Sequence, residues 1–314
     1  MAFIAAVLLT NAALFSTPIF EDGDFALNSL QIREAKSFRE LLGNYSRWGF
    51  HHPGPAVFYV MAFGEWLFHD AARLVPAPMN AQLLTIVLFN AVFLFATVRI
   101  FLSHSPSPSF VPLALAAAAV VTATINHDLA GSAPVSVWMP HVALFPFLFF
   151  LAVCAQVAAG EIRRLPLLAG AGMLLVHLHV AQCLFAAALG GAACLLGLRR
   201  GAAPWRRPAI LAAVVVCVFL APILLEIALS EPDNVDAVLA YMRQHRGAQN
   251  SFGVAIWYFC TFLAYLPTPD TAQPGFASLW ASLARPYVAL YWLAFAALAA
   301  AWTSATTRFW SELR

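Results

Sequence analysis

Charged side chains are scarce in this chain, at 10% of 314 residues against 62% hydrophobic residues. A soluble domain typically carries about 25% charged residues. Lys36 is the only lysine and the net charge is only +2, so the sequence lacks a polybasic surface for nucleic acid. Solid apolar runs of about 20 residues, enough for a helix to cross a hydrocarbon core of ~30 Å, recur along the whole length. These features predict an all-α polytopic membrane protein.

Cysteine pairs and the common cofactor motifs are missing as well. The five cysteines lie inside apolar segments without CxxC spacing, so we expect small apolar side chains rather than disulfides or metal ligands. No P-loop, Rossmann glycine pattern, HExxH motif or serine-hydrolase elbow occurs. The sequence therefore does not indicate chemistry with a soluble cofactor.

Eight apolar segments are predicted to span the membrane within a single domain. The fifth and sixth form one long run, which we divide at the polar cluster His177 to Gln182, because polar residues suit a membrane surface better than its middle. The first segment lacks the basic start and small-residue cleavage site of a signal peptide, which favours a retained helix. The predicted spans are Ala2 to Phe20, Asn80 to Ser103, Ser109 to Ile125, His141 to Ala159, Leu165 to Val180, Ala181 to Leu198, Pro208 to Leu229 and Pro286 to Ser304.

Two further apolar segments, Pro55 to Leu74 and Phe252 to Leu266, are expected to lie along the outer face or dip into it. If Phe252 to Leu266 crosses instead, there are nine spans and the carboxyl terminus moves outside. Arginine-bearing turns stay cytoplasmic, which puts the long first loop, Glu21 to Met79, on the outer side. Within that loop, Asp24 to Leu42 has the spacing of an amphipathic helix, with Gly43-Asn44 as its stop.

The first outer loop contains the leading candidates for chemistry. Asp22 and Asp24 directly follow the first span, and a carboxylate beside apolar walls can act as a general base. The competing interpretation makes Asp24 the cap of the following helix and Asp22 a turn residue. His51-His52-Pro53-Gly54-Pro55 holds two imidazoles in a stiff turn, with Arg47 nearby to bind a phosphate.

Eight of the nine histidines fall in outer loops or at outer helix ends, where imidazole can bind phosphate, move a proton or ligate a metal. His177, His179 and Gln182 could line a cavity beside Glu226, which is costly inside a span unless it is paired. The candidate substrate-binding residues are Tyr45, Arg47, His51, His52, Trp138, His141, His179, Arg243 and Arg246.

The stretch from Gly23-Asp24-Phe25-Ala26-Leu27 to His52-Pro53-Gly54-Pro55, together with Trp138-Met139-Pro140-His141, resembles a bacterial branch of the GT-C superfamily of membrane glycosyltransferases. Its relatives include protein O-mannosyltransferases and aminoarabinose transferases. The resemblance implies a polyprenyl-phosphate sugar donor and a site on the periplasmic side of the inner membrane. It also implies that Asp24, or Asp22 as the close second, is the general base or ligates a divalent metal ion.

Two other functions are compatible with the sequence. A transporter or lipid flippase would use Glu226, His177 and His179 at mid-membrane, although no internal repeat accompanies them. A noncatalytic assembly subunit would use the acidic loop only for topology. The resemblance favours transfer of a sugar to an acceptor hydroxyl on a lipid, glycan or protein.

Overall fold

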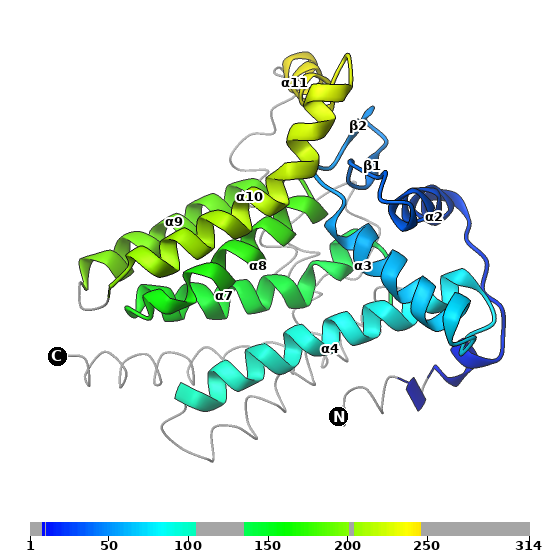
Figure 1. The fold of residues 1–314 in the computed structure, drawn as a ribbon, viewed down its shortest axis with the longest axis horizontal. Coiled ribbons are helices and arrows are strands. Elements are labelled where there is room, and N and C mark those ends of the chain that lie inside the picture. Colours follow the sequence, from blue (N-terminus) through cyan, green and yellow to red (C-terminus); the bar gives the residue numbers. More distant parts are fainter. Residues whose placement is uncertain (1–7, 10, 105–134, 201–203, 246–314) are drawn as a thin grey trace, which may run out of the picture. The chain divides into compact units, whose positions relative to one another are not determined.

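The structure is a computed structural model that describes residues 8, 9, 11–104, 135–200 and 204–245. These residues belong almost entirely to one compact unit, Met1–Phe101 with Pro134–Gln244, and the second unit, Leu102–Ala133 with His245–Arg314, lies largely outside them. The described part is mostly helical (Figure 1). Its elements are η1 (Ala12–Phe15), α2 (Gly23–Lys36), β1 (Tyr45–Ser46), β2 (Phe50–His51), α3 (Ala56–Glu65), η2 (Trp66–Ala71), α4 (Pro78–His104), α6 (Met139–Val142), α7 (Leu144–Ala158), η3 (Ile162–Arg164), α8 (Leu165–Leu178), α9 (Gln182–Arg199), α10 (Arg206–Leu229) and α11 (Asn234–Gln244).

Among the described residues, four helical segments are long and apolar enough to cross a bilayer, which supports the prediction of a membrane protein. They are Pro78–Phe101, Met139–Ala158, Gln182–Arg199 and Arg206–Leu229. Each corresponds to a predicted span. The predicted spans at 109–125 and 286–304, and the segment at 252–266, lie outside the described residues, so a total of eight spans stays a prediction.

Helix α8 lies at the centre of the helical packing, in contact with α7, α9 and α10 (Figure 1). Leu175 on α8 is fully buried, as are Val153 and Val157 on α7. Helix α10 is different, because most of its apolar side chains are exposed. At 14 residues, α8 is shorter than a typical spanning helix.

The predicted division between the fifth and sixth apolar segments is confirmed. Helix α8 ends at Leu178, and His179 has extended backbone angles, φ −161° and ψ 132°. The His179 ring then accepts a hydrogen bond from the Ala181 amide (3.1 Å), and α9 begins at Gln182. The polar cluster therefore interrupts the long apolar run where the sequence indicated.

The predicted first span does not continue as a helix to Phe20. After Asn11 the chain forms only the 3-10 turn η1, and residues 16–22 then follow an irregular path. The fully buried Asn80 side chain supports this irregular backbone: its amide group donates to the carbonyls of Leu14 and Thr17, and its Oδ1 accepts from the Ile19 amide, all at 2.9 Å. Backbone groups that a helix would pair are thus satisfied by one side chain.

The helix predicted over Asp24 to Leu42 is confirmed in kind but corrected at both ends. It begins at Gly23 and stops at Lys36, well before Gly43. Phe38 adopts a left-handed conformation (φ 57°), and the amides of Phe38 and Arg39 donate back to the carbonyls of Ala35 and Glu34. This is the Schellman arrangement, which usually has glycine at the position of Phe38.

The predicted helix in Pro55 to Leu74 is present as α3 followed by the wider turn η2. Helix α3 packs against α2, and Phe58 and Met61 on α3 belong to the same hydrophobic core as Ile32 on α2. Gly64 lies so close to the Thr85 side chain on α4 that a Cβ would collide with it. The two helices of the first loop are therefore held against the start of α4.

Candidate functional site

A cleft of about 570 Å³ lies between α2 and the facing wall made by the end of α3 and the first turns of α4. Its lining combines acidic, basic and apolar side chains. The lining residues are Glu21, Ala26, Ser29, Leu30, Arg33, Lys36, Ser37, Glu65, Pro78 and Gln82. All come from the first loop, residues 21–79, or the adjoining turns of α4, the region that the sequence indicated for chemistry.

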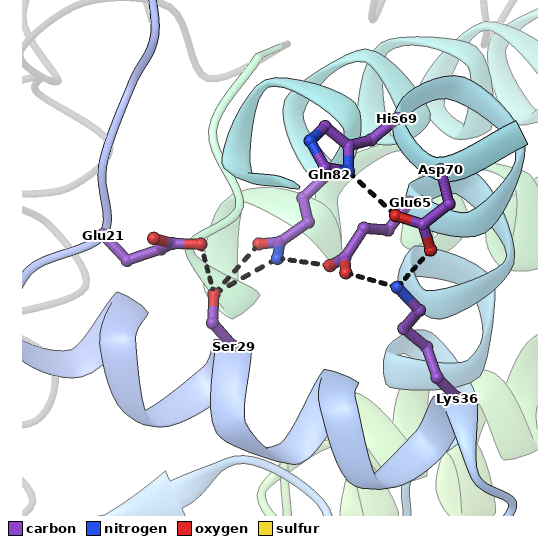
Figure 2. Close-up of polar contacts among 7 residues, drawn as sticks. All are labelled: Glu21, Ser29, Lys36, Glu65, His69, Asp70 and Gln82. Atoms are coloured by element: carbon purple, nitrogen blue, oxygen red, sulfur yellow. Dashed lines mark hydrogen bonds and ion pairs between the residues drawn. The ribbon is translucent and has the colours of Figure 1, made fainter. Parts of the chain in front are cut away.

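A continuous polar network crosses this cleft (Figure 2). Ser29 Oγ donates to Glu21 Oε1 (3.0 Å), and Gln82 Nε2 donates to Ser29 Oγ (3.2 Å) and to Glu65 Oε2 (3.1 Å). Lys36 Nζ then donates to the other Glu65 oxygen (2.8 Å). Gln82 is only 2% exposed and Glu65 8%, so little water reaches these two side chains. Their hydrogen bonds therefore hold Ser29 and Lys36 in fixed positions.

The outer end of the network concentrates charge around Lys36. Its ammonium also contacts Asp70, and Asp70 Oδ1 lies 2.8 Å from His69 Nδ1. Burial alone would lower the pKa of Lys36, but hydrogen bonds and charges from Asp70 and Glu65 outweigh it and raise that pKa. The Lys36 hydrogen bond, followed by that of His69, lowers the pKa of Asp70. The only lysine of the chain is therefore held charged between two carboxylates.

The two aspartates predicted as catalytic are both exposed at the start of α2 and do not line this cleft. Asp22, not Asp24, occupies the N-cap position, and its side chain makes no capping hydrogen bond. Asp24 lies in the first helical turn, where a negative charge is favoured by the helix dipole. Of the three neighbouring acidic residues, only Glu21, which precedes α2, lines the cleft.

A second polar cluster joins the β1–β2 hairpin to the segment after α10. The two strands pair antiparallel, with Tyr45 opposite His51. The His51 amide donates to Asn234 Oδ1 (2.7 Å), and Asn234 Nδ2 donates to the His51 carbonyl (2.8 Å), so the side chain pairs with β2 as a neighbouring strand would. The two oxygens of the buried Glu226 carboxylate in turn accept hydrogen bonds from the backbone N–H of Asn234, at 3.1 and 3.3 Å. The first loop is thus hydrogen-bonded to the segment after α10.

Three histidines hold the turn after β2 against α8. The His52 and His179 rings lie 4.2 Å apart, and His52 Nδ1 accepts from the Val180 amide (3.4 Å). Burial, then the nearby His179 and His51, lowers the pKa of His52 to about 4, so its ring is neutral at pH 7. His177 Nδ1 accepts from the Ala56 amide (3.3 Å) and its Nε2 donates to the Phe219 carbonyl (3.0 Å).

The other predicted substrate-binding residues divide into three groups. Tyr45 packs edge-on against His51, whereas Arg47 and Arg243 are exposed. Trp138 and His141 contact each other at the start of α6, and neither ring nitrogen of the buried His141 has a hydrogen-bond partner among the described residues. Arg246 lies outside the described residues. The structure therefore brings Tyr45, His51, His52 and His179 together, and it pairs Trp138 with His141.

Sequence reasoning missed the residues that form the cleft, above all Glu65, Lys36 and Gln82. The available signals were weak: Glu65 interrupts an apolar segment, and Lys36 is the only lysine. Within the described ranges, no three His, Cys, Asp or Glu side chains are grouped so that they could hold a metal ion.

The mostly helical fold, with four long apolar helical segments among the described residues, supports a helical membrane protein, and a polar cleft lies in its first loop. Comparison with known protein families, curated proteins and solved structures found no match to this chain.

Proposed function

We propose that this protein is a GT-C-type membrane glycosyltransferase, which moves a sugar from a polyprenyl-phosphate donor to an acceptor hydroxyl at the outer face of a bacterial inner membrane. The proposal combines the resemblance of the first loop with one observation that carries most weight. The acidic turn after the first apolar segment adjoins a cleft of about 570 Å³ that contains both carboxylates and cations. That volume is within the range of about 300–1,000 Å³ typical of small-molecule sites.

In the proposed reaction, Glu21 is the general base. Its carboxylate takes the proton of the acceptor hydroxyl, and the hydroxyl oxygen bonds to the anomeric carbon as the bond from that carbon to the phosphate oxygen breaks. The electron pair of that bond leaves with polyprenyl phosphate, whose low basicity removes the need for a strong general acid. Glu21 is favoured over Asp24 and Asp22 because it alone of the three lines the cleft and is oriented by Ser29.

The transporter alternative gains little from the buried polar residues on which it depends. Glu226 accepts a hydrogen bond from the backbone N–H of Asn234, and both ring nitrogens of His177 make hydrogen bonds to backbone groups. A residue on a proton or substrate path must exchange its partners during transport, whereas these side chains fix loop and helix ends. Their burial is explained by structural hydrogen bonds.

Transfer by the purified full chain tests the proposal. The protein in nanodiscs is given polyprenyl-phosphate donors with labelled hexose, N-acetylhexosamine or aminopentose, and both transfer to membrane extract and donor hydrolysis are measured. We expect Glu21→Gln to lower the rate by about 10²–10⁴-fold, the usual range for a lost general base. Glu34→Gln, the same change at an exposed glutamate of α2 outside the cleft, is the matched control.

The outcomes separate the candidates. Loss of transfer in Asp24→Asn with full activity in Glu21→Gln would assign the base to Asp24, as the resemblance implies. Full activity in Glu21→Gln, Asp22→Asn and Asp24→Asn would refute the carboxylate mechanism. No transfer or hydrolysis of any donor by the wild type would refute the glycosyltransferase function.

A further inference from the structure

The two cations that line the cleft differ in whether a carboxylate pairs with them. Four ionisable side chains line it, namely Glu21, Arg33, Lys36 and Glu65. Lys36 is already committed to Glu65 and Asp70, so its charge is compensated by two carboxylates. A ligand would have to break these contacts to use Lys36, which makes this ammonium a poor anchor for a bound anion.

Arg33 is the cation of the cleft that remains available. It is exposed, and among the described residues no ion pair or hydrogen bond to its guanidinium is found. Its position on α2, four residues after Ser29 and three before Lys36, places it on the same helix face as both. A guanidinium binds phosphate through two parallel hydrogen bonds, a stronger and more directional contact than a lone ammonium can provide.

The remaining lining indicates an amphiphilic ligand. Ala26, Leu30 and Pro78 contribute an apolar strip beside the charged groups. Pro78 and Gln82 also belong to the first turns of a candidate membrane span, Pro78–Phe101, so the cleft lies at the level where that helix enters the bilayer. The phosphate of a lipid stands at this level, with its hydrocarbon chain in the apolar layer below.

We infer that Arg33 binds the phosphate group of a long-chain lipid-alcohol phosphate in this cleft, with the start of the hydrocarbon chain along Leu30 and Pro78. This inference rests on the proposed function and assigns the donor phosphate to α2, in place of the predicted Arg47, His51 and His52. Ser29, which orients Glu21, lies one helical turn from Arg33, about 6 Å along the axis. The sugar of the donor then fits between the base and the phosphate anchor.

Binding of polyprenyl phosphate without a sugar tests the inference separately from catalysis. The full-chain protein is placed in nanodiscs of zwitterionic lipid, and its tryptophan fluorescence is titrated with polyprenyl phosphate, polyprenyl alcohol or inorganic phosphate. We expect polyprenyl phosphate to bind best and Arg33→Gln to weaken it by about 10–100-fold, as for a lost charge-assisted contact. Arg33→Lys should restore part of the affinity. Arg39→Gln, whose arginine pairs with the exposed Glu34 outside the cleft, should bind like the wild type.

The possible failures are distinguishable. Unchanged affinity in Arg33→Gln would overturn the inference, as would an equal loss in Arg39→Gln. Equal binding of the alcohol would refute the phosphate contact, and equal binding of inorganic phosphate would refute the lipid ligand. Arg33-dependent lipid binding without sugar transfer from any donor would support the inference and overturn the proposed function.

Discussion

Replacing Lys36 with methionine should destabilise the first loop substantially. Methionine retains most of the apolar side chain but removes the ammonium, so Glu65 loses its 2.8 Å partner while it stays nearly buried. The Glu65 side chain is 10% exposed, whereas that of Lys36 is 27% exposed. The pair is therefore intermediate between a surface ion pair and a fully buried one.

The magnitude follows from these exposures. Breaking a fully buried pair costs about 3–5 kcal/mol, because the remaining charge is uncompensated. Gln82 still donates to the second Glu65 oxygen, and water can reach the position of the ammonium, so we expect about 2 kcal/mol. The exposed pair between Arg39 and Glu34 is the internal standard, since removing such a pair costs about 0–1 kcal/mol.

Thermal unfolding in detergent provides the measurement. At about 2–4 °C per kcal/mol, Lys36→Met should lower the midpoint by about 4–8 °C, and Arg39→Met by clearly less. In a Glu65→Gln background, Lys36→Met should cost much less, because the carboxylate is gone. If the effects of the two single substitutions simply add in the double variant, the two side chains are uncoupled and the reasoning is refuted.

Two other side chains support predictions that can be checked on the same purified protein. Asn80→Leu removes three hydrogen bonds to backbone groups and should lower the free energy of unfolding by about 3 kcal/mol. Hydrogen exchange at the Ile19 amide should become faster in this variant, and unchanged exchange there would contradict the role of Asn80. The pKa of His52 falls from 6.5 to about 4 on folding. The contribution of the neutral His52 ring to the free energy of unfolding is therefore complete above pH 6.5 and is lost as the pH falls toward 4, because the unfolded chain takes up the proton first. His52→Asn should therefore flatten the dependence of the thermal midpoint on pH across that window, and an equally steep dependence in this variant would refute the assignment.

The sequence predicted the apolar helices well, because composition alone determines which segments can be buried in lipid. It placed α4, α7, α9 and α10 close to their observed bounds. It failed where long-range contacts decide the backbone. The irregular chain before Phe20 depends on Asn80, some sixty residues away, and no local pattern carries that information.

The candidate site shows the same limit more sharply. The pattern identified the acidic turn at residues 21–24, but it could not say which carboxylate faces the cleft. Successive residues of a helix differ by about 100° in direction, so the choice depends on where α2 begins. Because α2 starts at Gly23, Asp22 and Asp24 are exposed while Glu21, still in the preceding loop, contacts Ser29.

Four buried polar side chains at or near the ends of apolar helices share one structural task. Asn80 and Gln82 stand at the start of α4, His177 at the end of α8 and Glu226 near the end of α10. Asn80, His177 and Glu226 hold irregular backbone of the first loop or of the segment after α10, and Gln82 holds the cleft network. A polar group is costly in a membrane helix unless it is paired. Here that pairing holds loop segments against the helix ends, and it orders the polar network of the cleft.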